Sequence, residues 1–184
     1  MKKSVCVLLA GISLVGMSIF SGCGNSVPFS AETKKLKHNR YNVVATVDSK
    51  VSSEDMENIS KKVVDDTLKE HPDAHGIYIN ITDAPEGISY TLNQYEYGPA
   101  GSAGYDPRNS KQEKSLKLVR DRSQKDWSTR PSSKEYEIYN KYTSFLLAHP
   151  GTSEKDFLMQ ATDLKLSVEE LDAVEKKVVA WMMH

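Results

Sequence analysis

The stretch HGIYINITDAPEGISYTLNQYEYG, residues 75–98, decides the fold of this chain. Its first part alternates strictly, with isoleucine at positions 77, 79 and 81 and polar or aromatic side chains between them. Such alternation indicates a strand with one packed face and one face in water. The APEG tetrapeptide then predicts a turn, and residues 88–98 predict a further strand that returns antiparallel to the first.

A strand and a helix precede this hairpin. Residues 41–48, YNVVATVD, are rich in β-branched side chains and predict a strand. Residues 52–72 predict a helix, because Ser52 and Asp55 form a capping pattern and His71-Pro72 ends the apolar helical spacing. The order is therefore β-α-β-β. A right-handed crossover makes the first two strands parallel and places the helix on the isoleucine face.

The C-terminal part of the chain predicts helices. The serines at positions 132, 153 and 167 are each followed three residues later by an acidic residue, which is the pattern of a helix start. We therefore expect an α+β fold, with a small β-α-β-β sheet domain followed by a C-terminal helical hairpin or three-helix segment. This order loosely resembles secreted bacterial domains of unassigned activity, a resemblance that implies no function.

The N-terminus has the layout of a secretory signal peptide. Lys2 and Lys3 precede an uncharged run over residues 5–20, which is shorter than the roughly 20 apolar residues that a membrane-spanning helix needs. The run ends in IFSGCGN, which resembles the lipobox of bacterial lipoproteins, with Phe20 at a position that is usually leucine. The resemblance implies that residues 1–22 are removed and that a diacylglycerol is attached to Cys23.

Lipidation would decide where the protein works. Two acyl chains give stable membrane attachment, so we expect a protein on the extracytoplasmic face of the cell membrane, with a Gram-positive envelope favoured. The membrane is then one partner, and intracellular nucleic acid is excluded as another. Cys6 leaves with the signal peptide and Cys23 is blocked by lipid. The mature chain therefore has no thiol left for catalysis or metal binding.

These observations divide the chain into five parts. They are a signal peptide over 1–22, a lipid-anchored tether over 23–39, the β-α-β-β domain over 40–100, a basic loop or linker over 101–131 and the helical segment over 132–184. The tether is polar and without periodicity. Its basic residues (Lys34, Lys35, Lys37 and Arg40) either rest on anionic lipid headgroups or are solvated.

Residues 108–134 carry the strongest local charge, with nine basic and three acidic side chains. Such a segment is typical of an anion-binding surface, here for an anionic envelope polymer or a protein partner. The alternative is a solvated helix whose charges offset acidic residues elsewhere. The candidate anion-binding residues are Lys111, Lys114, Lys117, Arg120, Arg122 and Lys125.

Tyrosines gather in the last two predicted strands. Tyr78, Tyr95 and Tyr97 would form a platform for a sugar or peptide ligand if they shared the wet face of the sheet, because tyrosine has an apolar body and a polar tip. The alternative is that tyrosine simply suits half-buried strands.

No pattern in the sequence predicts a catalytic site, a metal site or a cofactor. Ser102 lacks the G-x-S-x-G spacing of a nucleophile elbow, and Pro72 separates His71 from His75 so that they do not share a helix face. We therefore expect a non-enzymatic lipoprotein with a binding or interaction role in the cell envelope. An envelope hydrolase with an unrecognised site and a phage-exclusion or defence lipoprotein remain as alternatives.

Overall fold

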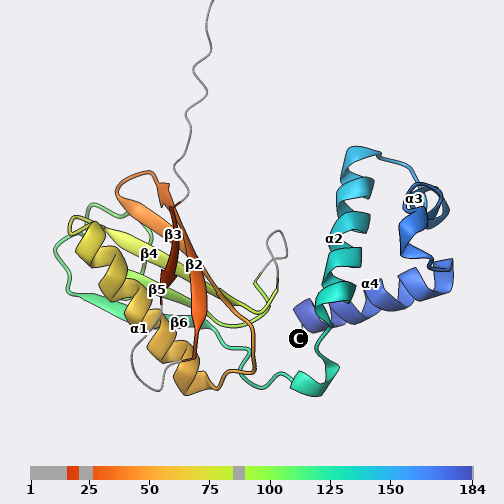
Figure 1. Ribbon diagram of the computed structural model, residues 1–184. Coiled ribbons are helices and arrows are strands. Elements are labelled where there is room, and N and C mark those ends of the chain that lie inside the picture. The colour runs from red at the N-terminus through yellow and green to blue at the C-terminus, as the bar shows by residue number, and fades with distance from the viewer. Residues whose placement is uncertain (1–15, 21–26, 85–89, 184) are drawn as a thin grey trace, which may run out of the picture.

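The computed structural model describes residues 16–20, 27–84 and 90–183, which form a mixed sheet followed by helices (Figure 1). The strands of the sheet lie side by side in sequence order: β1 (Gly16–Phe20), β2 (Phe29–Leu36), β3 (Arg40–Val47), β4 (Gly76–Thr82), β5 (Gln94–Pro99) and β6 (Lys114–Arg120). β3 and β4 are parallel, and every other neighbouring pair is antiparallel. The expected α+β fold, the parallel crossover and the antiparallel β4–β5 hairpin are confirmed.

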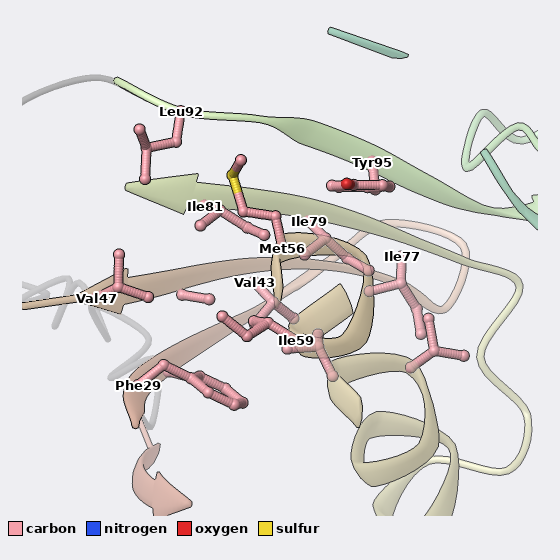
Figure 2. Close-up of a cluster of buried hydrophobic side chains, with 14 of the residues drawn as sticks. Phe29, Val43, Val47, Met56, Ile59, Ile77, Ile79, Ile81, Leu92 and Tyr95 are labelled. Carbon is pink, nitrogen blue, oxygen red and sulfur yellow. The ribbon is translucent and has the colours of Figure 1, made fainter. Parts of the chain in front are cut away.

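Helix α1 (Ser53–Glu70) connects the parallel strands and packs on one face of the sheet. It begins in a capping box, in which the Ser52 hydroxyl accepts from the Asp55 amide at 3.1 Å and the Ser52 amide donates to the Asp55 carboxylate at 2.8 Å. Figure 2 shows the core between helix and sheet, with Met56 and Ile59 of α1 among side chains of the strands. All three isoleucines of β4 are 0% exposed there, so the alternation at 77–81 is what fixes the covered face.

β2 occupies much of the segment for which the sequence led us to expect a tether. Phe29 and Ala31 are buried in the core beneath α1, and the whole strand pairs with β3. The prediction of an aperiodic tether is therefore wrong for residues 29–36, and Lys34 and Lys35 are exposed side chains of a strand. Lysines are common where a sheet nears its edge. Because of these lysines, the alternation of buried and exposed side chains that begins at Phe29 is too short to be recognised in the sequence.

β6 was missed in the same way, because it lies inside the predicted loop over 101–131. It pairs antiparallel with β5 and forms the outer strand of the described sheet on that side. Leu116 packs against the core, whereas Leu118 and Val119 are 41% and 54% exposed. Because so few of its side chains are buried, β6 shows no clear alternation of apolar and polar residues in its sequence.

The three expected C-terminal helices are confirmed. They are α2 (Ser133–Ala148), α3 (Glu154–Gln160) and α4 (Val168–Met183), with short 3-10 turns η1 (Trp127–Thr129) and η2 (Thr162–Leu164). Their own core contains Ile138, Tyr142, Phe157 and Leu171. A separate cluster of Ala84, Tyr136, Val178 and Trp181 joins α2 and α4 to the residues that follow β4. The helical segment therefore docks at the carboxyl end of the parallel strands.

Candidate functional site

A cleft of about 500 Å³ lies where β3 and β4 end and α2 begins. Thr46 and Asp48 reach it from the end of β3, and Asp83 and Ala84 from the end of β4. The opposite wall is made by Arg130, Ser133, Tyr136, Glu137, Asn140 and Lys141. Open sheets with parallel strands commonly bind ligands just outside the carboxyl ends of those strands. The cleft is therefore the candidate functional site.

Asp83 is the buried centre of a polar network on the cleft wall. Its side chain is 0% exposed, and its Oδ2 accepts from Nε of Arg130 at 2.7 Å. Its Oδ1 accepts from Nε1 of Trp181 at 3.3 Å and from the hydroxyl of Thr91. A buried carboxylate requires donors of this kind, because an unpaired charge inside a protein is strongly destabilising.

Arg130 bridges the ends of the two parallel strands. Its Nη2 donates to the main-chain oxygen of Asp83 at 2.9 Å, and its Nη1 donates to the main-chain oxygen of Asp48 at 3.4 Å. The side chain keeps 28% of its surface exposed. The guanidinium thus fixes the geometry of the strand ends and still lines the cleft.

Helix α2 supplies groups of both charges to the cleft. Glu137 and Lys141 lie one turn apart and form an ion pair at 2.9 Å, with much of both side chains exposed. The Tyr136 side chain is buried beside Asp83, and burial, followed by the negative charge of Asp83, raises the pKa of its hydroxyl. That hydroxyl therefore stays protonated at neutral pH. The arrangement suits a small polar ligand that carries both charges.

Sequence reasoning missed this site because its members are far apart in the chain. Trp181 reaches Asp83 across 98 residues, and Arg130 reaches it across 47. One local signal was present: Asp83 directly follows the isoleucine-rich strand, and Asp48 directly follows the strand before it. Polar residues at the ends of two parallel strands meet in space, so the predicted crossover already implied that they lie near each other.

The predicted anion-binding residues Arg122 and Lys125 hold the C-terminal end of α4. Nζ of Lys125 donates to the main-chain oxygen of Trp181 and lies 4.2 Å from the centroid of its ring. Nη1 of Arg122 donates to the main-chain oxygen of Met182 and, at 3.3 Å, to that of Tyr90. Positive charges are favourable at the C-terminus of a helix, where carbonyl groups lack partners. Arg122 and Lys125 therefore bind the end of α4 within the protein.

Of the other four predicted anion-binding residues, three lie on β6 and one lies just before it. Lys111 lies in the loop before the strand, and Lys114 begins the strand and donates to the main-chain oxygen of Ala74 at 2.6 Å. Lys117 and Arg120 are exposed further along. Because a strand advances by about 3.3 Å per residue, the six residues from 111 to 125 do not make one compact surface.

The predicted tyrosine platform is wrong. Tyr95 pairs with Ile79 and Tyr97 with Ile77, and cross-strand partners share a face, so both tyrosines point toward the α1 side. Tyr95 is only 5% exposed. Tyr78 lies on the other face, where its hydroxyl accepts from Nη1 of Arg40 at 3.1 Å. The parity of each strand was known from the sequence, but the pairing register that relates two strands was not.

No family model, curated protein or solved structure matches this chain. Cys23 lies outside the described residues. Within the part of the chain that the structure describes, no helix has the length and apolar character that a membrane crossing requires. The same residues contain no group of three or more histidine, cysteine, aspartate or glutamate side chains arranged to hold a metal ion.

Proposed function

We propose that this chain is a lipid-anchored protein of the extracytoplasmic membrane face, and that its cleft binds a small polar ligand of the cell envelope. The cleft carries the proposal. It combines a size of about 500 Å³ with the exposed part of Arg130, the carboxylate of Glu137 and the ammonium group of Lys141. Groups of both charges favour a ligand with both charges, such as a short peptide.

The N-terminal sequence supports the location. The basic start, the uncharged run and the lipobox-like IFSGCGN favour export and lipidation at Cys23. Processing before Cys23 would remove β1 with the rest of residues 1–22 and leave β2 as the outer strand of the sheet on that side. Cys23→Ser should move the protein from the membrane fraction to the soluble fraction, and the wild type should carry a diacylglycerol detectable by mass spectrometry. An unmodified wild type that stays with the membrane would contradict the anchor.

Site-specific crosslinking tests the ligand site. A photo-crosslinking amino acid is placed at Glu137, which lines the cleft and is 64% exposed, and in a second variant at Met159 of α3, which is 69% exposed and lies outside the cleft. After irradiation of intact cells, mass spectrometry should find a discrete small-molecule or peptide adduct at position 137 and none at position 159. Equal adducts at the two positions, or none at 137, would count against the cleft.

A further inference from the structure

The end of the sheet opposite the cleft is formed by the turn between β2 and β3, where the chain is rich in basic residues. Lys34, Lys35 and Lys37 are exposed, and Arg40 follows them at the start of β3. Arg40 is held in place by donating from Nε to the main-chain oxygen of Lys37 at 3.0 Å and from Nη1 to the Tyr78 hydroxyl. We call this region, residues 34–40 together with the side chains that pack on it, the hairpin end.

Aromatic contacts give the hairpin end a defined shape. The turn passes through His38 and Asn39, both with positive φ, of 61° and 50°. Histidine and asparagine are among the residues that adopt this conformation most readily. The His38 ring stacks on Tyr105 with centroids 4.3 Å apart, and His75 meets the edge of the same tyrosine at 5.1 Å. The loop before β6 is thereby fixed against the turn.

A third histidine extends the cluster. His71 at the end of α1 stacks on Tyr41 at 4.4 Å, and Nζ of Lys35 lies 5.8 Å from the centroid of that tyrosine ring. Lys114 joins from β6 through the main-chain oxygen of Ala74, next to His75. His38, His71 and His75 therefore lie at the same end of the sheet as Lys35 and Lys114.

Two acidic residues at this end have partners within the protein. Asp106 pairs with Arg108 at 3.0 Å, and Asp73 accepts from the Asn39 side chain at 2.7 Å. Glu70 and Glu113 add further negative charge nearby. In contrast, the described structure gives Lys34 and Lys37 no salt bridge within 4.0 Å. The positive charges of the hairpin end are therefore not held in direct ion pairs in the described structure, although Glu70, Asp73, Glu96 and Glu113 lie at the same end of the sheet.

We propose that the hairpin end is a second binding surface, and that it takes a linear polyanion bearing phosphate or carboxylate groups. Lys34, Lys35, Lys37, Arg40 and Lys114 supply positive charge along one end of the sheet. This surface is separate from the cleft, which lies at the other ends of β3 and β4.

Binding of inorganic polyphosphate to the full-length processed protein in nonionic detergent tests the proposal, with polygalacturonate of similar length as the carboxylate probe. The triple variant Lys34→Gln, Lys35→Gln, Lys37→Gln should weaken binding at low salt by about tenfold or more, because three phosphate contacts are lost. The slope of log K against log salt should also fall in magnitude by about two, since each contact contributes roughly 0.7.

A matched control removes the same charge elsewhere. Lys61→Gln, Lys155→Gln, Lys176→Gln takes three exposed lysines from α1, α3 and α4 and should change the affinity by less than about twofold. Near-ultraviolet circular dichroism establishes that both triple variants are folded. Equal weakening by the two triple variants, or no binding of either polymer at 50 mM salt (about a 14 Å screening length), would overturn the proposal.

Discussion

Asp83 and Arg130 are 47 residues apart in the sequence, and their side chains form an ion pair of 2.7 Å that joins the end of β4 to the start of the helical segment. The carboxylate is fully buried, while the guanidinium remains partly exposed in the cleft. Asp83 thus anchors the pair inside the protein, and Arg130 presents part of its side chain to the cleft. The stability of the docked helices and the shape of the cleft depend on the same contact.

Replacing Arg130 with methionine should lower the free energy of unfolding by about 3 kcal/mol, because a buried carboxylate is left without its main partner. Urea unfolding followed by the fluorescence of Trp127 and Trp181 measures this change. The matched control is Lys176→Met, which breaks an exposed ion pair of similar length and should cost no more than about 0.5 kcal/mol. Similar small losses in both variants would show that Asp83 finds other donors.

Lys125 should make the stability depend on pH in the alkaline range. Burial, followed by the charge of Arg122, lowers the pKa of Lys125 from 10.5 to about 8 in the folded protein. Between these two pH values the unfolded chain holds a proton that the folded protein has released, so stability rises with pH. Unfolding free energies at pH 7.5, 8.5 and 9.5 should therefore increase in the wild type relative to Lys125→Met. Lys176→Met serves as the control, and parallel curves for wild type and Lys125→Met would contradict the expectation.

Gly76 at the start of β4 should tolerate no side chain. A Cβ built there would lie 2.6 Å from both the Cα and the main-chain oxygen of Ala103, and backbone atoms cannot rotate away. Gly76→Ala should therefore destabilise the protein by about 2 kcal/mol through overpacking, which thermal unfolding would register as a drop of about 5 °C. Gly104→Ala is the control, since its nearest contact is the Ser102 hydroxyl at 3.3 Å, which can move. A control that loses as much as Gly76→Ala would mean that the loop, rather than the close approach, is responsible.

The β3–α1–β4–β5 order was predictable because its signals are local. The isoleucine alternation, the capping box at Ser52 and the His71-Pro72 stop each lie within one element, and β3, α1 and β4 formed where expected. β5 was expected from residue 88 but begins at Gln94. β2 and β6 were not predictable in this way. Both strands are held by pairing with a covered neighbour, β3 for β2 and β5 for β6. Both also carry exposed lysines, which make a segment look like a loop in the sequence.

The candidate site depends on relationships that a single element does not contain. Asp83, Arg130 and Trp181 meet only because the helical segment folds back onto the end of β4. The tyrosine platform failed for a related reason, since the pairing register between β4 and β5 decides which face of one strand matches which face of the next. Charge counting along residues 108–134 failed because one extended strand separates the cations that the sequence places together.

The direction of β2 has a consequence for how the protein would stand on a membrane. Five residues separate Cys23 from Phe29, and a chain of that length reaches about 20 Å at most. Phe29 pairs with Val47 at the carboxyl end of β3, which is the end that bears the cleft. If Cys23 carries the lipid, the cleft opens close to the bilayer surface. The eight residues of β2 separate the lysines of the turn from that end of the sheet by about 25 Å.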